Sequence, residues 1–153
     1  MTLDPLEQQR FGLGPIDQIS FAVRDMEEAV PRYCAMFGGP FAVVDVPGLD
    51  VLVRGEATKT SLRLGFGYSG SLEVELVQVL DGLWPTLDWL DKHGEGLHHL
   101  RYPVADVAAS RAEMVRAGFV VTVESVDASF AYLESPLLND MTVELLQAAP
   151  PGP

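Results

Sequence analysis

The sequence is poor in cysteine and in positive charge. Its single cysteine, Cys34, cannot form a disulfide within the chain, so we expect a reducing, cytoplasmic environment. The 153 residues include 10 Lys and Arg against 22 Asp and Glu, which leaves a formal net charge of −12. That charge repels phosphate backbones and anionic lipid. It therefore argues against nucleic acid and membrane surfaces as partners.

Long apolar runs are also missing. No segment reaches the ~18 consecutive apolar residues that a membrane span needs. No apolar N-terminal stretch headed by Lys or Arg predicts a signal peptide. Hydrophobic residues nevertheless make up 48% of the chain, which is enough to form a core in one domain or in two small fused units.

What the sequence does contain is an internal repeat. Residues 94–106 hold two of the three histidines, and they match residues 16–25 when slid back by 81 positions. Under that shift Gln18 falls on His99. Each half of the chain therefore opens with a predicted strand that carries one polar residue in this position.

A second repeat lies at the end of each half. Residues 74–78, Val-Glu-Leu-Val-Gln, recur 69 positions later as residues 143–147, Val-Glu-Leu-Leu-Gln. The two halves thus close with apolar strands that carry Glu75 and Glu144. An unpaired carboxylate in such a strand is costly to bury. The two repeats together predict four polar side chains, two from each half, that share a site.

The strand and helix signals predict the order β-α-β-β-β in both halves. Asp25 and Asp106 are the expected N-caps of the two module helices, and Gly38-Gly39 and Gly118 are the expected ends. The predicted elements are strands at 16–23, 41–46, 51–54 (broken), 61–68 and 72–80, a helix at 26–36, then strands at 97–104, 119–124, 130–134 and 141–147 and a helix at 107–117. The predicted organisation is an N-terminal arm (1–13), a first module (14–82), a linker helix (83–95), a second module (96–148) and a tail (149–153).

This organisation resembles the vicinal-oxygen-chelate superfamily, which includes glyoxalases, methylmalonyl-CoA epimerases, extradiol dioxygenases and antibiotic-binding resistance proteins. Residues 89–100, Trp-Leu-Asp-Lys-His-Gly-Glu-Gly-Leu-His-His-Leu, look most like the epimerase branch. The resemblance covers residues 14–148. It implies an α+β, glyoxalase-like fold in which two tandem βαβββ modules form a curved, partly open mixed sheet around one divalent metal ion. It also implies a homodimer that acts on a small molecule.

Carried over residue by residue, the family's metal ligands fall on Gln18, Glu75, His99 and Glu144. Two carboxylates neutralise a dication, and an imidazole and an amide oxygen complete a mixed shell. Such a shell suits Co, Mn, Ni, Zn or Mg without selecting one. The family's chemistry assigns proton transfer to Glu144 and Glu75. Strand alternation places His98 on the opposite face, as a packing or supporting residue.

The sequence departs from the families that it resembles. The epimerases usually have histidine at the position of Gln18. The Gln/Glu/His/Glu set is similar to that of animal-type glyoxalase I, but Ala22 and Val79 stand where that enzyme has the Arg and Asn that hold glutathione. This argues against glutathione as the substrate. The facial triad of extradiol dioxygenases needs a second histidine, which Gln18 does not supply.

The epimerases also use an acid/base group on the strand before Glu75, and residues 61–68 contain no carboxylate. An inversion by two bases would then have to use Glu75 or Glu144, or borrow Tyr68 or Tyr132. We also expect Tyr68 and Tyr132 to contact the substrate, together with Arg101, which shares strand parity with His99 and is suited to an anionic group. Three hypotheses follow. The first is an epimerase or isomerase that stabilises an enolate, the second a lyase of the glyoxalase type, and the third a metal-free protein that binds a small molecule.

Overall fold

The computed structural model describes residues 7–149 and arranges them as an α+β fold with eight strands in one sheet. The order β-α-β-β-β occurs twice, which explains the two sequence repeats. The first module consists of β1 (Gln18–Ala22), α2 (Met26–Phe37), β2 (Ala42–Val53), β3 (Glu56–Ser69) and β4 (Leu72–Asp81).

The second module follows the linker helix α3 (Pro85–His93) and repeats the pattern with shorter strands. It consists of β5 (Gly96–Val104), α4 (Val107–Arg116), β6 (Val120–Ser125), β7 (Phe130–Ser135), the 3₁₀ helix η1 (Pro136–Leu138) and β8 (Met141–Gln147). A short helix, α1 (Glu7–Phe11), precedes both modules.

The strands close into a barrel in the order β1-β4-β3-β2-β6-β7-β8-β5. One seam between the modules is the antiparallel pair β1–β5. The other is short: only Val51–Val53 of β2 pair with Val123–Ser125 of β6. The predicted glyoxalase-like fold is confirmed, with one correction, because this short seam closes the sheet that we expected to be partly open.

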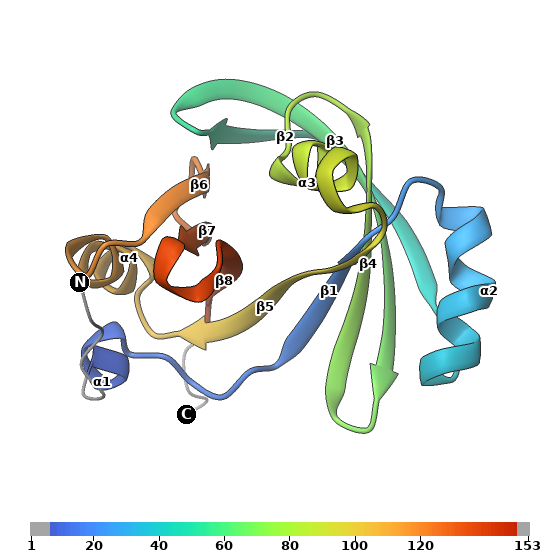
Figure 1. The fold of residues 1–153 in the computed structure, drawn as a ribbon, viewed down its shortest axis with the longest axis horizontal. Helices are drawn as coiled ribbons and strands as arrows, with labels where there is room; N and C mark the ends of the chain where they lie inside the picture. Colours follow the sequence, from blue (N-terminus) through green and yellow to red (C-terminus); the bar gives the residue numbers. More distant parts are fainter. Residues whose placement is uncertain (1–6, 150–153) are drawn as a thin grey trace.

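The two module helices cover the outside of the barrel. Figure 1 shows α2 and α4 at opposite ends of the molecule, with α1 beside α4. Under α2 lies an apolar cluster around Val23, Met26 and Leu76, and under α4 lies a larger one that includes Met114 and Leu145. A third cluster, centred on Val77, Trp84 and Tyr132, fills part of the barrel interior. Strands β3 and β4 thus contact α2, and strands β6, β7 and β8 contact α4, on the outside of the barrel.

Residues within the sequence repeats also cap the N-termini of the two module helices. Asp25 and Asp106 are the N-caps, and each carboxylate accepts a hydrogen bond from the backbone three residues on, as predicted. The last residue of each strand repeat adds a second contact. Gln78 Oε1 accepts from Met26 N at 2.9 Å, and Gln147 Oε1 accepts from Val107 N at 3.2 Å. Each closing strand is thereby tied to the helix of its own module.

Two elements differ from the sequence-based expectation. The segments 41–46 and 51–54 form one continuous strand, β2, because the register shift between Val46 and Leu49 absorbs the Pro-Gly interruption. The described part of the predicted N-terminal arm contains α1, where Phe11 is buried and packs edge-on against Phe119 at 5.8 Å. The sequence pattern did not predict α1, because five residues are too few to show the apolar periodicity of a helix. Residues 1–6, and most of the predicted tail, lie outside the described residues.

Within residues 7–149, every helix is too short or too polar to cross a membrane.

Candidate metal and proton-transfer site

The strand register brings polar residues from four strands onto the inner face of the barrel. Residues that pair across neighbouring strands share a face of the sheet. Ser20 pairs with Glu75 on β4 and with His99 on β5, and Gln18 pairs with Arg101 on β5. The seam between β1 and β5 therefore places the polar residues of the first module directly beside those of the second.

The same rule adds the last strand of the second module. Glu144 on β8 pairs with Arg101 on one side and with Tyr132 on the other. The predicted set Gln18, Glu75, His99 and Glu144 thus meets inside the barrel. All four residues are buried, and none is more than 7% exposed.

His99 lies between the two carboxylates. Its Nε2 is 3.8 Å from Glu75 Oε1 and 3.7 Å from Glu144 Oε1. Both distances exceed a hydrogen bond, and Nε2 is a buried atom without a hydrogen-bond partner. A buried polar atom without a partner is rare in folded proteins and calls for an explanation.

Gln18 presents a second such atom. Its Nε2 donates to Glu73 Oε1 at 2.5 Å, and because a carboxylate only accepts, this contact fixes which end of the amide is the nitrogen. Gln18 Oε1 is thereby turned away from Glu73, buried and without a partner. The interior therefore contains an unpaired amide oxygen and an unpaired imidazole nitrogen next to two carboxylates.

Burial dominates the electrostatics of the carboxylates. It raises the pKa of Glu75 to about 7, although a hydrogen bond from Ser20 Oγ at 2.8 Å opposes that rise. It raises the pKa of Glu144 to about 8, with the Glu75 charge adding to the rise and with Arg101 and a hydrogen bond from Tyr132 opposing it. Without a bound cation, neutral pH thus lies close to the point at which these carboxyls exchange a proton.

The other predicted residues take different places. Tyr132 is buried beside His99, with ring centroids 4.7 Å apart. Arg101 is half-buried, and its Nε donates to Asp17 Oδ1 at 2.8 Å, so its charge is already compensated. Tyr68 is 60% exposed and does not reach the four residues; its hydroxyl donates to Glu73 Oε2 at 3.0 Å.

His98 does not follow the simple alternation that predicted it on the face opposite His99. Ser20 and Phe21 of β1 pair with His99 and Leu97 of β5, so a register shift leaves His98 as an extra residue between them. Its Nδ1 lies 2.9 Å from His99 Nδ1, and its ring centroid lies 6.4 Å from that of Tyr132. It is 6% exposed, and burial lowers its pKa to about 4.

The supporting residues Ser20 and Glu73 were missed from the sequence. Glu73 shares strand parity with Glu75, and Ser20 lies two residues after Gln18, so alternation placed both on the correct face. Their roles depend on the pairing of β1 with β4, which the pattern of a single strand does not contain.

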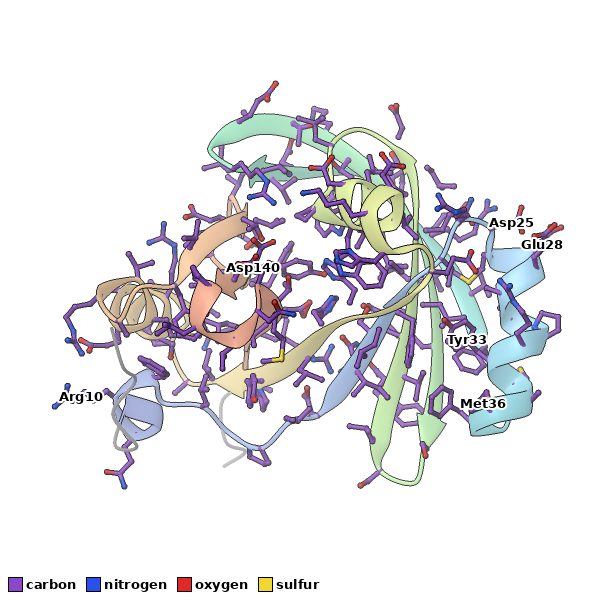
Figure 2. All side chains as sticks on the ribbon, viewed as in Figure 1. Arg10, Asp25, Glu28, Tyr33, Met36 and Asp140 are labelled. Carbon is purple, nitrogen blue, oxygen red and sulfur yellow. The ribbon has the colours of Figure 1, made fainter. Side chains whose placement is uncertain are left out.

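A cavity of about 150 Å³ adjoins the carboxylates. Its walls are apolar except for Glu75, Glu144 and Tyr132, and they include Leu62, Leu64, Trp84 and Phe130. A second cleft, of about 550 Å³, is lined by His98 and His99 and by residues of α3. A further hollow, which Tyr33 and Met36 of α2 line, lies on the far side of the first-module strands in Figure 2.

Among residues 7–149, no three or more His, Cys, Asp or Glu side chains are already arranged as a metal cluster.

Both the sequence and the fold resemble those of known proteins. The sequence model of the Glyoxalase/Bleomycin resistance protein/Dioxygenase superfamily matches residues 17–134, which is most of the chain. The chain belongs to this superfamily. No curated protein matches its sequence.

Solved structures share the fold at low sequence identity. A hypothetical protein from Bacillus halodurans is 19% identical, with a TM-score of 0.67 and coverage of 91% of this chain and 97% of that one. A methylmalonyl-CoA epimerase from Mycobacterium tuberculosis is 18% identical (TM-score 0.63, 91% of both chains). A variant of the Streptomyces coelicolor methylmalonyl-CoA epimerase, in complex with 2-nitronate-propionyl-CoA, is 23% identical (TM-score 0.62, 90% of this chain and 99% of that one).

Proposed function

We propose that this protein is a divalent-metal-dependent epimerase or isomerase that forms an enolate from a carbonyl or acyl-thioester substrate. The observation that carries the proposal is the placement of two buried carboxylates, Glu75 and Glu144, on either side of the unpaired His99 Nε2. The likeness to methylmalonyl-CoA epimerases supports the same class of reaction. A lyase of the glyoxalase type would begin with the same removal of a proton.

The residues fit a divalent cation. Gln18 Oε1 and His99 Nε2 are both buried without a partner, and a cation would satisfy them together. Glu75 and Glu144 would supply the compensating charge. This oxygen-rich donor set suits Co, Mn, Ni, Zn or Mg. When bound, the cation would polarise the substrate carbonyl and stabilise the negative charge of the enolate.

The chain's own residues would move the proton. Glu75 and Glu144 line the cavity, so either carboxylate could accept the α-proton and return it. Phe66, not a carboxylate, pairs with Glu75 on β3, so inversion by two bases would have to use Glu75 and Glu144 themselves. The apolar cavity walls exclude water, which strengthens electrostatic interactions inside.

The first test is metal content together with proton exchange. Protein purified without a histidine tag should contain about one divalent ion per chain. Glu144→Ala should lose this ion, because removal of one carboxylate leaves the charge of the buried cation incompletely compensated. The loaded wild type should wash deuterium into the α-position of 2-methyl-3-oxo thioesters or α-oxo acids in D₂O. Absence of metal in both proteins, even after incubation with Mn, Co, Ni and Zn, would overturn the proposal.

A second candidate function is metal-free binding of a small apolar molecule. It is supported by the apolar walls of the cavity beside Glu75 and Glu144. In that case the wild type would bind a small apolar ligand equally well with and without EDTA, and Trp84→Ala, which enlarges the cavity, would change the size of ligand that it accepts.

A further inference from the structure

His98 and His99 form an unusual hydrogen bond, because both partners are the Nδ1 atoms of consecutive residues. The atoms are 2.9 Å apart, and the ring planes are nearly perpendicular at 89°. A hydrogen bond between two ring nitrogens requires one N–H and one lone pair. One of the two imidazoles is therefore the donor, and the direction of this bond decides which nitrogen of His99 is free.

The two directions have opposite consequences at Nε2 of His99. If His98 donates, the Nδ1 of His99 carries a lone pair, and a neutral His99 must carry its proton on Nε2. That N–H would lie 3.7–3.8 Å from the carboxylate oxygens, beyond hydrogen-bond distance. If His99 donates, Nε2 carries the lone pair and faces Glu75 and Glu144, and a metal ion requires such a lone pair.

We propose that His98 is a positioning residue that accepts the hydrogen bond from His99 Nδ1–H and so fixes Nε2 of His99 as the free, unprotonated nitrogen of the site. This proposal rests on the proposed function for its metal ion, but the hydrogen-bond direction is a property of the metal-free protein. In many metal sites a second group holds the far ring nitrogen of the ligand in this way. A neighbouring histidine in the same strand serves here.

The surroundings of His98 hold its ring in place. Trp89 of α3 approaches it edge-on, with ring centroids 5.7 Å apart and planes at 88°. Trp89 is itself stacked on His93 at 5.0 Å. The linker helix therefore sets the orientation of the ring that orients His99. The two histidines also line a cleft of about 550 Å³ between α3, β5 and the loop before β8.

Three substitutions of His98 distinguish the effect of its hydrogen-bond acceptor from the effect of its size. In Asn the oxygen is attached to Cγ, as Nδ1 is in His, so His98→Asn keeps an acceptor at the required position. In Gln the oxygen lies one bond further out, and Leu has no acceptor. Calorimetric titration with Mn²⁺ and Zn²⁺ should show His98→Asn within about 3-fold of the wild type. His98→Gln and His98→Leu should bind 10–100-fold more weakly, which is the usual loss for such supporting residues.

The tautomer can be read directly in the metal-free wild type. The chain contains three histidines, so His98→Asn and His93→Gln assign the ring signals of ¹⁵N-histidine-labelled protein by subtraction. We expect the Nδ1–H pattern for His99 and the Nε2–H pattern for His98. The Nε2–H pattern for His99 would overturn the proposal.

The two measurements keep this proposal apart from the proposed function. A wild type that binds no metal ion contradicts the metal-dependent function, while the tautomer of His99 still decides the role of His98. A wild type that binds metal, with equal affinity in His98→Leu, leaves the function standing and overturns the role of His98.

Discussion

The two modules contribute to the site from equivalent strands, but they support their residues by different means. In the first module, polar neighbours hold Gln18 and Glu75: Glu73 accepts from the amide, and Ser20 donates to the carboxylate. In the second module, rings surround the corresponding residues, with His98 against His99 and Tyr132 against both His99 and Glu144.

The difference shows how a repeated fold builds an asymmetric centre. The polar support of the first module fixes the orientation of an amide, which has no intrinsic preference between its two ends. The aromatic support of the second module fixes the ring nitrogen of His99 and keeps water away from Glu144. Substitutions that remove one support at a time test whether the modules make distinct contributions.

The largest effect should come from the two carboxylates themselves. Glu75→Gln and Glu144→Gln keep an oxygen donor but cannot accept a proton, so α-proton exchange in D₂O should fall about 10²–10⁴-fold in each. Metal content measured on the same samples separates lost binding from lost proton transfer. The exposed Glu56→Gln is the matched control and should be unchanged. If one of the two variants keeps the wild-type rate of α-proton exchange, the carboxylate of that module takes no part in proton transfer.

The next effect is on stability, and its sign follows from the raised pKa values. Above about pH 4.5 the unfolded carboxyls are ionised, whereas native Glu75 and Glu144 keep their protons up to about pH 7 and 8. The metal-free protein should therefore lose stability as pH rises from about 4.5 to about 8. In the lower part of this window, the lowered pKa values of His98 and His99 act in the opposite direction.

Glu144→Gln should abolish the part of this pH-dependent loss of stability that comes from Glu144. In urea unfolding with EDTA, the free energy of unfolding of the variant should exceed that of the wild type by about 3 kcal/mol at pH 8.5. This difference should shrink toward about pH 4.5. Glu75→Gln should show the same trend with a smaller gain. A difference that stays constant with pH would mean that the carboxyls are not protonated in the native metal-free state.

Much of this centre was visible in the sequence because its geometry repeats. The two repeats identified Gln18, Glu75, His99 and Glu144, and strand alternation placed each on a face. The caps Asp25 and Asp106 fixed where both helices begin. These signals are local, since each depends on residues within one element or on two copies of the same pattern.

The remaining features depend on which strands become neighbours. The β1–β5 seam, which brings Ser20 beside His99, joins residues 79 positions apart in different modules. No periodicity within either strand encodes that pairing. The exposure of Tyr68 has a similar origin, because its face was predictable but its distance from the barrel interior was not. The Nδ1–Nδ1 contact of His98 depends on the ring of Trp89 from another element.

A smaller effect is expected at the polar support of Gln18. Glu73→Leu removes the acceptor that fixes the amide, so Gln18 should lose its preferred end and metal affinity should fall about 10–100-fold. Glu73→Gln retains an oxygen acceptor and should lose less. Calorimetric titration with Mn²⁺ or Zn²⁺ measures both. Equal affinity in Glu73→Leu and the wild type would show that the amide of Gln18 is not a ligand.

The smallest effect should separate the two supports of the carboxylates. Ser20→Ala and Tyr132→Phe each remove one hydroxyl that lowers the pKa of one carboxyl, Glu75 in the first case and Glu144 in the second. Loss of one such hydrogen bond is worth about 1 kcal/mol, so the midpoint of the matching carboxyl titration in the metal-free protein, followed by NMR, should rise by somewhat less than one unit. If Ser20→Ala moves only the lower midpoint and Tyr132→Phe only the upper one, each module tunes its own carboxylate. If either variant moves both midpoints equally, the carboxyls titrate as one unit across the seam between β1 and β5, and the modules do not act independently.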